Sequence, residues 1–180
     1  MPGLPPIGAE IPCSMLGINT PLRLKDSLVS VDFRGGIKHR VDVNPEDPIN
    51  SVLMRTIGFR ITAELPPADG GDDGDGGTVT IEQNDVDVDV KSLLRLTQQF
   101  PPRYENVWVL PFTMTIDRPG NGGVQILTTK DPARLVGQLT QYPPRGDLYQ
   151  LQHPVELVDP ERPDAPVATL QKLPVKVGGL

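Results

Sequence analysis

The chain is poor in cysteine and in long apolar runs, and each shortage excludes a class of protein. Cys13 is the only cysteine, so no disulfide forms within the chain and no oxidising compartment is required. No stretch approaches the roughly 20 apolar residues of a membrane-spanning helix, and the N-terminus lacks the basic start and apolar run of a secretory signal. The sequence therefore predicts a cytoplasmic protein with no membrane partner.

Aromatic residues are also scarce, at 4% of 180 residues, and the formal net charge is -6. An acidic chain repels nucleic-acid phosphates, and few aromatic side chains leave little surface on which bases stack. We therefore expect no nucleic-acid partner. Proline and glycine are abundant instead, at 21 and 18 residues, which favours short strands and turns over long helices.

Several segments place apolar residues at every second position, which is the period of a strand with one buried face. They suggest four antiparallel hairpins, which pair residues 27–33 with 37–43, 57–65 with 78–83, 106–117 with 123–129, and 148–158 with 167–171. The first hairpin would turn at Arg34-Gly35-Gly36, because glycine readily adopts positive φ. The strand expected at the centre of the core carries Trp108, Leu110, Phe112, Met114 and Ile116 on one face.

The intervals between the hairpins resemble one another. Asp47, Asp89 and Asp131 recur every 42 residues, since 89 minus 47 and 131 minus 89 both equal 42. The segment Leu96-Thr-Gln-Gln-Phe-Pro-Pro-Arg103 returns, one glutamine shorter, as Leu139-Thr-Gln-Tyr-Pro-Pro-Arg145. This agreement suggests duplication of a unit of about 42 residues.

Two of these intervals also carry a helix signal. Asp47-Pro48 and Asp131-Pro132 fit the start of a short helix, because aspartate caps the first turn and proline is tolerated within it. Residues 89–99 fit a helix and a strand equally well, so their structure stays open.

Together these patterns predict a mainly β fold. We expect a single-domain β-sandwich or barrel of about eight strands, built from successive hairpins with one to three short helical crossovers. Residues 1–21 would form a Pro-rich N-terminal arm, residues 22–175 the β domain, and residues 176–180 a flexible C-terminal tail.

His39 and His153 are the only histidines, and strand alternation places both on apolar faces. For His153 an alternative stays open, because a bend of the strand before Pro154 would carry this histidine outward. Two histidines meeting in an apolar cavity would act as acid and base on a small molecule, with Tyr149 in support. We favour the non-catalytic interpretation, in which each imidazole ring only stabilises the fold and is hydrogen-bonded to a neighbouring backbone carbonyl.

Two weaker candidates involve charged side chains. Asp69, Asp72, Asp73 and Asp75 lie in a Gly-rich loop that offers oxygen ligands to calcium, although their spacing does not match a known calcium motif and a solvated loop is the preferred interpretation. Arg103 and Arg145 end the matching Pro-Pro-Arg segments and would present guanidinium groups to a carboxylate or to a partner chain. The preferred interpretation is that each arginine pairs with a local acid and stabilises its own segment. No motif predicts a cofactor.

These observations leave three functional hypotheses. The first is a non-catalytic binding or assembly protein that associates with copies of itself or with another protein through edge strands and Pro-rich segments. The second is a cofactor-independent enzyme of the isomerase or cyclase type, with a small-molecule ligand in an apolar β-lined cavity. The third is a calcium-binding adhesion-type module.

Overall fold

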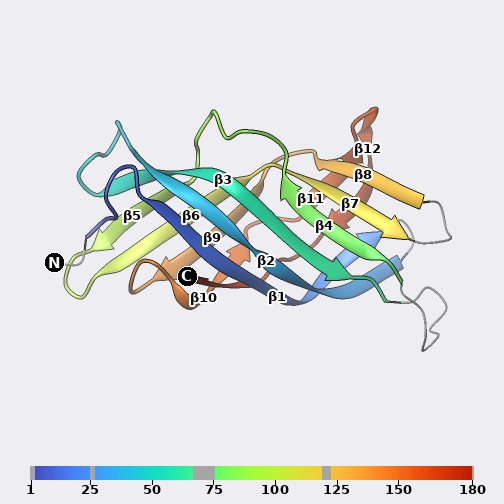
Figure 1. The fold of residues 1–180 in the computed structure, drawn as a ribbon, viewed down its shortest axis with the longest axis horizontal. Helices are drawn as coiled ribbons and strands as arrows, with labels where there is room; N and C mark the ends of the chain where they lie inside the picture. Colours follow the sequence, from blue (N-terminus) through green and yellow to red (C-terminus); the bar gives the residue numbers. More distant parts are fainter. Residues whose placement is uncertain (1–2, 25–26, 67–75, 119–122, 180) are drawn as a thin grey trace.

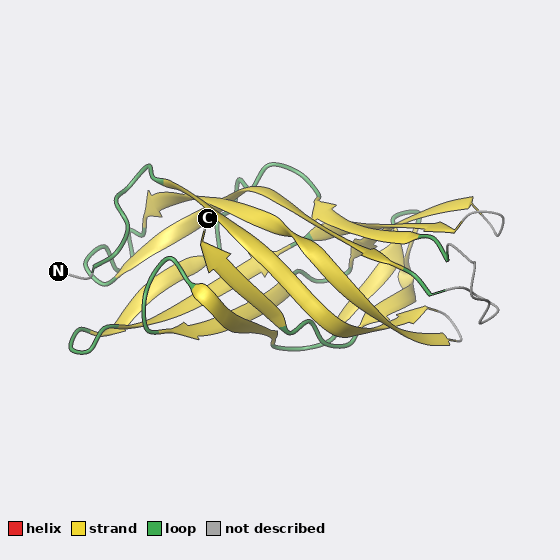
Figure 2. Ribbon diagram, turned by 60° about the horizontal axis from the view of Figure 1, so that its bottom comes forward, coloured by secondary structure: helices red, strands yellow, loops and turns green. Residues whose placement is uncertain are grey.

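A computed structural model describes residues 3–24, 27–66, 76–118 and 123–179. All regular structure in these residues is β, and Figure 2 shows strands without a helix. The strands are β1 (Glu10–Leu24), β2 (Ser27–Val43), β3 (Ser51–Glu64), β4 (Thr78–Gln83), β5 (Leu93–Gln98), β6 (Arg103–Leu110), β7 (Phe112–Arg118), β8 (Gly123–Thr129), β9 (Ala133–Leu139), β10 (Arg145–Leu151), β11 (Val155–Asp159), β12 (Arg162–Leu170) and β13 (Val175–Gly179).

The 13 strands form one antiparallel sheet in the order β12-β11-β8-β7-β4-β3-β2-β1-β13-β10-β9-β6-β5. The sheet closes on itself twice, because β12 also pairs with β1 and β5 also pairs with β3. Two closed lobes result, and they share the long strands β1, β2 and β3. Lobe A adds β5, β6, β9, β10 and β13, whereas lobe B adds β4, β7, β8, β11 and β12 (Figure 1).

The expectation of about eight strands was too low, because the sequence pattern does not reveal that one sheet closes twice. Hairpins two, three and four are confirmed as the antiparallel pairs β3–β4, β7–β8 and β11–β12. Two expected long strands are each divided between the lobes. The first is interrupted at Pro111, which separates β6 from β7, and the second at residues 152–154, which separate β10 from β11.

The first expected hairpin was wrong, because residues 27–43 form one continuous strand. Gly35 and Gly36 do not turn the chain. They permit close approach of neighbouring backbones, since a Cβ on Gly35 would lie 2.0 Å from the carbonyl oxygen of Arg60 and one on Gly36 would lie 2.9 Å from that of Cys13. The glycines therefore allow β2 to pack tightly between β1 and β3.

The expected N-terminal arm is also shorter than predicted, because residues 10–24 form the central strand β1. Proline lacks the N–H that a strand with two neighbours needs. Pro12 and Pro21 are accommodated because β13 pairs only with residues 13–16 and β12 only with residues 22–24, so both prolines have β2 as their strand neighbour. At the other end, residues 175–179 form β13 and are not a tail.

The expected helical crossovers do not form in the described residues. At Asp47 the capping geometry is present, since the Asn50 amide donates to its carboxylate and the Ser51 amide donates to its carbonyl. The chain extends into β3 after this single turn. After Pro132 it extends directly into β9, and the open region 89–99 contains β5.

The two echoing segments fold alike. The first segment lies in the lobe A hairpin β5–β6, after which the chain forms the lobe B hairpin β7–β8. The second lies in the lobe A hairpin β9–β10, after which the chain forms the lobe B hairpin β11–β12. The Phe100–Pro101 and Tyr142–Pro143 peptide bonds are both cis. The matching sequences therefore correspond to matching paths through the sheet.

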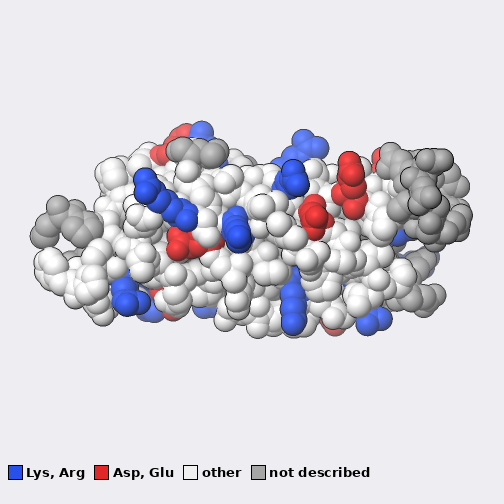
Figure 3. Space-filling model, turned by 90° about the horizontal axis from the view of Figure 1, so that it is seen from below, with Lys and Arg blue, Asp and Glu red and all other residues white. Residues whose placement is uncertain are grey.

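The inward-facing apolar side chains form one continuous core through both lobes. The five residues expected on one face, Trp108, Leu110, Phe112, Met114 and Ile116, are all buried. Basic and acidic side chains are interspersed on the face shown in Figure 3, so this face has no patch of one sign. The described residues include no helix that is long and apolar enough to span a membrane.

Candidate functional site

A row of side chains from three adjacent strands crosses the interior of lobe A. Gly137 of β9 lies opposite Tyr149 of β10 on one side and opposite Asn106 of β6 on the other. A Cβ on Gly137 would lie 2.7 Å from the Tyr149 ring, so glycine leaves the space that this ring occupies. The Tyr149 hydroxyl therefore reaches across β9 and donates a hydrogen bond of 2.5 Å to Oδ1 of Asn106.

Two further rings extend this buried row. The Trp108 indole stacks on Tyr149 with ring centroids 4.2 Å apart, and the His39 imidazole lies 5.3 Å from Trp108. Within the described chain, both ring nitrogens of His39, Nε1 of Trp108 and Oγ1 of Thr56 are buried without a hydrogen-bond partner. Thr56 lies directly opposite His39 across β2 and β3, so these two unpartnered groups are neighbours.

Burial controls the protonation of this interior. It lowers the pKa of His39 to about 3, because a charged imidazolium has no water or carboxylate to stabilise it there. Burial raises the pKa of Cys13 to about 11 and also raises the pKa of Tyr149. At neutral pH these groups are all uncharged, so Cys13 is not a nucleophilic thiolate.

The hydrogen bond between Tyr149 and Asn106 leads to a stability prediction. We expect Tyr149→Phe to lower the free energy of unfolding by about 1–3 kcal/mol, because Asn106 Oδ1 is left buried without a donor. Tyr142→Phe is the control, because the Tyr142 hydroxyl has no hydrogen-bond partner among the described residues. Urea denaturation of both variants measures the difference, and equal losses would show that the bond contributes nothing.

A second feature lies at the waist, where the two lobes meet. β5 pairs with residues 51–53 of β3 and β4 pairs with residues 60–64, so residues 54–59 have no described strand partner on that side. The segment 84–92, here called the waist connector, covers this gap. Its Asp87 carboxylate accepts a hydrogen bond of 2.9 Å from the Thr56 amide, and its Ser92 carbonyl accepts one from Met54.

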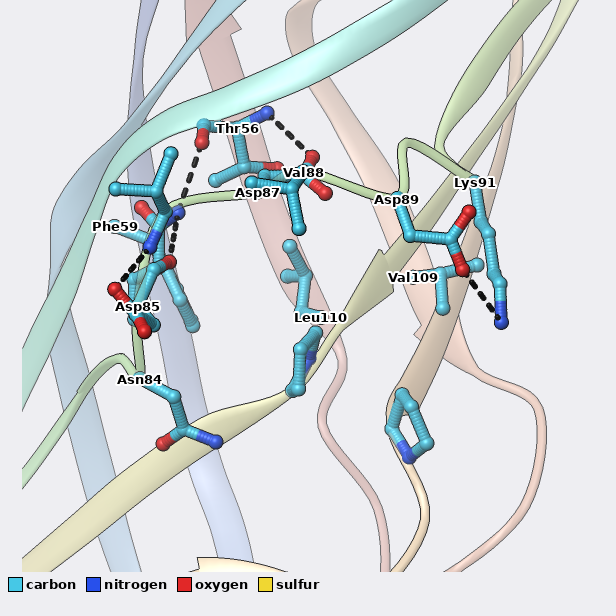
Figure 4. A pocket seen from close by; sticks show the side chains of 14 residues that line it. Thr56, Phe59, Asn84, Asp85, Asp87, Val88, Asp89, Lys91, Val109 and Leu110 are labelled. Atoms are coloured by element: carbon cyan, nitrogen blue, oxygen red, sulfur yellow. Dashed lines mark hydrogen bonds and ion pairs between the residues drawn. The ribbon is translucent and has the colours of Figure 1, made fainter.

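A pocket of about 230 Å³, here called the waist pocket, lies between the connector and the strands (Figure 4). Thr56, Phe59 and Leu110 line its strand side. The connector contributes alternating acidic and apolar residues to its rim, namely Asp85, Val86, Asp87, Val88 and Asp89. The Asp89 carboxylate lies 3.5 Å from the Lys91 ammonium, so the rim carries one local ion pair (Figure 4).

A third feature is an unpaired strand edge on lobe B. β8 pairs with β7 along its length but with β11 only at Thr128 and Thr129. The outer edge of residues 123–127 therefore has no strand partner in the described chain. Val124 and Ile126, which are 59% and 55% exposed, project from the outer face of this segment, whereas Gln125 lies opposite buried Ile116.

The structure does not bring the two histidines together. His39 is fully buried in lobe A, as alternation predicted. Alternation was wrong for His153, which follows the alternative expectation of a bend that carries it outward. His153 is exposed in the bend between β10 and β11, immediately before Pro154, where the strand pattern is broken. Tyr149 is buried and stacks on Trp108, and the other neighbour of that indole is His39.

The remaining candidates from the sequence are the four loop aspartates and the two arginines. Asp69, Asp72, Asp73 and Asp75 fall outside the described residues. Arg103 and Arg145 begin β6 and β10, each directly after a cis-proline segment, and both are exposed. Neither guanidinium forms an ion pair with another described residue, so the expected pairing with a local acid was wrong. A role for the two arginines in partner binding stays a prediction.

The sequence interpretation did not select Asn106 or Thr56. A signal for Asn106 exists, because it is an isolated amide beside Trp108 in the most apolar segment of the chain. Thr56 has no comparable signal, since its importance depends on the gap in strand pairing and on its register with His39.

Comparison with known proteins shows a related fold. One solved structure is similar, that of DynF from the dynemicin biosynthesis pathway of Micromonospora chersina. It is 18% identical in sequence, with a TM-score of 0.70 over 99% of this chain and 84% of that chain. No protein-family model and no curated protein sequence matches the chain.

Proposed function

We propose that this chain is a non-catalytic assembly protein that pairs with a second copy of itself through the outer edge of β8. The observation that supports this function is the unpaired edge of residues 123–127 together with its exposed apolar side chains. An unpaired strand edge presents backbone donors and acceptors to any complementary strand. Pairing with another chain would satisfy these groups and cover Val124 and Ile126.

The sequence of β8 favours pairing with itself. Residues 123–129 contain no charged residue and no proline, so the usual features that protect an edge strand are missing. In a twofold arrangement the same strand runs antiparallel to its copy, and no like charges would face each other. Val124 and Ile126 of one chain would lie beside those of the other.

The gap in β3 provides a contrast within the same molecule. There the unpaired stretch is covered by the waist connector, whose Asp87 and Ser92 accept hydrogen bonds from β3 amides. No described segment covers the edge of β8 in this way. Of these two unpaired stretches, β8 is therefore the one available to another chain.

Sedimentation velocity tests this proposal directly. We expect the wild-type protein to form dimers, and Ile126→Lys to raise the dissociation constant at least about tenfold, because the pairing would place two ammonium groups close together. Ile49→Lys is the matched control, since Ile49 is 83% exposed and lies before β3 in lobe A. It should dimerise like the wild type.

Two results would contradict the proposal. One is a wild-type protein that remains monomeric up to about 100 μM, where even a weak interface is populated. The other is an Ile126→Lys variant that dimerises as strongly as Ile49→Lys.

A further inference from the structure

Two strongly exposed apolar side chains line one groove on the surface of lobe A. Phe100 is 77% exposed and Ile49 is 83% exposed. The groove, here called the arm groove, lies at the end of lobe A that holds the N-terminus (Figure 1). Its walls are residues 3–7, residues 48–50 before β3, and the end of β5 with the turn that follows. Its volume is about 420 Å³, which is within the range of small-molecule sites.

The exposure of Phe100 is not a consequence of the turn in which it lies. Tyr142 occupies the equivalent position in the second echoing segment, before the matching Pro-Pro pair. There the aromatic ring packs against the core, and burial raises the pKa of its hydroxyl. The ring of Phe100 instead stays in contact with solvent beside other exposed apolar residues. Exposed apolar groups that gather in one place mark binding surfaces, whereas single scattered ones do not.

Hydrogen bonds fix the walls of the arm groove relative to one another. The Leu96 amide donates a bond of 2.7 Å to the Asn50 carbonyl, which joins β5 to the turn before β3. The Tyr104 hydroxyl donates a bond of 3.2 Å to the Gly3 carbonyl, which ties the N-terminal segment to β6. A site whose walls are already in place loses little conformational entropy when a ligand binds.

The lining of the groove defines the class of ligand. None of the described residues that line it is charged, although 22% of the chain is. A charged group held against this surface would lose hydration without gaining an ionic partner. The side-chain amides of Asn50 and Gln99 are exposed and have no hydrogen-bond partner in the described chain, so they offer neutral donors and acceptors. A neutral ligand with a polar group therefore fits the groove.

The extent of the groove favours a small molecule over a second chain. Twelve residues line it, whereas a stable protein interface takes about 20–30 residues from each partner. We propose that the arm groove binds a small neutral molecule with an apolar body and a hydroxyl or carbonyl group that bonds to Asn50 or Gln99. The site lies in lobe A and does not depend on the pairing of β8.

Binding of the neutral dye Nile red tests the site, because its emission shifts to shorter wavelength in apolar surroundings. We expect saturable binding of one dye molecule per chain. Phe100→Ser should raise the dissociation constant at least about fivefold, because the dye loses its contact with the aromatic ring. Thermal melting should show that this variant is as stable as the wild type, since Phe100 is exposed.

Leu28→Ser and Val88→Ser are the matched controls for the dye titration. Both side chains are exposed and apolar, and neither lines the arm groove. Val88 lines the waist pocket, so its variant also reports dye that binds there instead. Both variants should bind the dye with the wild-type dissociation constant.

Displacement of the dye by naphthol and by naphthoate identifies the ligand class. The two compounds share a ring system, but at neutral pH the first is uncharged and the second is an anion. We expect naphthoate to require at least about a tenfold higher concentration than naphthol, because no cationic group compensates its loss of hydration. Gln99→Lys places an ammonium group at the groove and should reduce this difference.

The proposal is supported if weaker dye binding is confined to Phe100→Ser and Gln99→Lys reduces the preference for naphthol. It is overturned by a lack of saturable dye binding, by equal losses in Phe100→Ser and either control, or by a naphthol preference that is absent in the wild type or unchanged in Gln99→Lys. A Phe100→Ser variant that keeps dye binding but no longer self-associates would also overturn it, because the groove would then be a contact between chains. The test of β8 pairing uses other variants and another readout, so the two proposals fail separately.

Discussion

Acidification from pH 6.5 to pH 4.5 is expected to remove about 2 kcal/mol of stability through His39 alone. The ordinary pKa of the imidazole is 6.5 and burial lowers it to about 3, so between these values the unfolded chain binds a proton that the native protein excludes. The stabilising contribution is complete above pH 6.5 and is lost as the pH falls toward 3. Its slope within this window is about 1.4 kcal/mol per pH unit.

The variant that tests this is His39→Phe, which keeps a ring against Trp108 and removes the titrating group. Because neither His39 nitrogen has a partner, the variant should be at least as stable as the wild type at pH 7.5. Urea denaturation at pH 7.5, 6.5, 5.5 and 4.5 would measure both effects. His153→Asn is the control, since His153 is exposed, and it should retain the wild-type pH dependence.

The prediction for His39 fails if wild type and His39→Phe lose stability in parallel as the pH falls. Parallel curves would mean that His39 is solvated or partnered in the native protein, and that the acid sensitivity belongs to carboxylates. The measurement is informative above pH 4.5, where ordinary aspartate and glutamate side chains remain mostly ionised.

Gly35→Ala is expected to lower the free energy of unfolding by about 3 kcal/mol or more. The added Cβ would lie 2.0 Å from the carbonyl oxygen of Arg60 and 2.8 Å from the Cα of Ile61. Both atoms belong to the backbone of the paired strand β3, so no side-chain rotation relieves the overlap. Relief requires β2 and β3 to separate in the region that both lobes share.

Gly58→Ala is the matched control for this substitution. Gly58 lies in β3 opposite Lys38, and a Cβ there would lie 4.0 Å from the Lys38 Cβ, an ordinary van der Waals distance. We expect its stability to differ from wild type by about 0.5 kcal/mol or less. Urea midpoints of the two variants give the comparison, and similar stabilities would show that β2 and β3 are less closely packed than the structure indicates.

Alternation of apolar residues was sufficient to predict the β class and three of the four hairpins. It succeeded because a strand with one buried face has a local signature, as in the segment that carries Trp108 and Phe112. It failed at Gly35 and Gly36, because a glycine needed for close backbone packing and a glycine needed for a turn look the same in sequence. Only the position of the neighbouring strand distinguishes these two kinds of glycine.

The division into two lobes was not predictable from local patterns. Closure depends on the long-range pairs β1–β12 and β3–β5, whose residues lie far apart in the sequence. The positions of the two histidines were predicted only in part, because alternation is a local pattern that holds only while the strand continues. The inward position of His39 follows from alternation, whereas the outward position of His153 follows from a bend before Pro154 that interrupts its strand.

The most direct test of the proposed assembly is disulfide cross-linking across the β8 edge. Single cysteines would replace Val124, Gln125 and Ile126 in turn, with Ile49→Cys as the control. The native Cys13 does not interfere, because it is 2% exposed. In an antiparallel pair the residue on the twofold axis faces its own copy at a Cα separation of about 4.5–5.5 Å, which a disulfide spans.

If β8 pairs with β8, one of the three edge variants forms a covalent dimer rapidly on mild oxidation, and the Ile49→Cys variant does not. If none of the three cross-links faster than Ile49→Cys, the edge of β8 is not the surface through which this protein assembles.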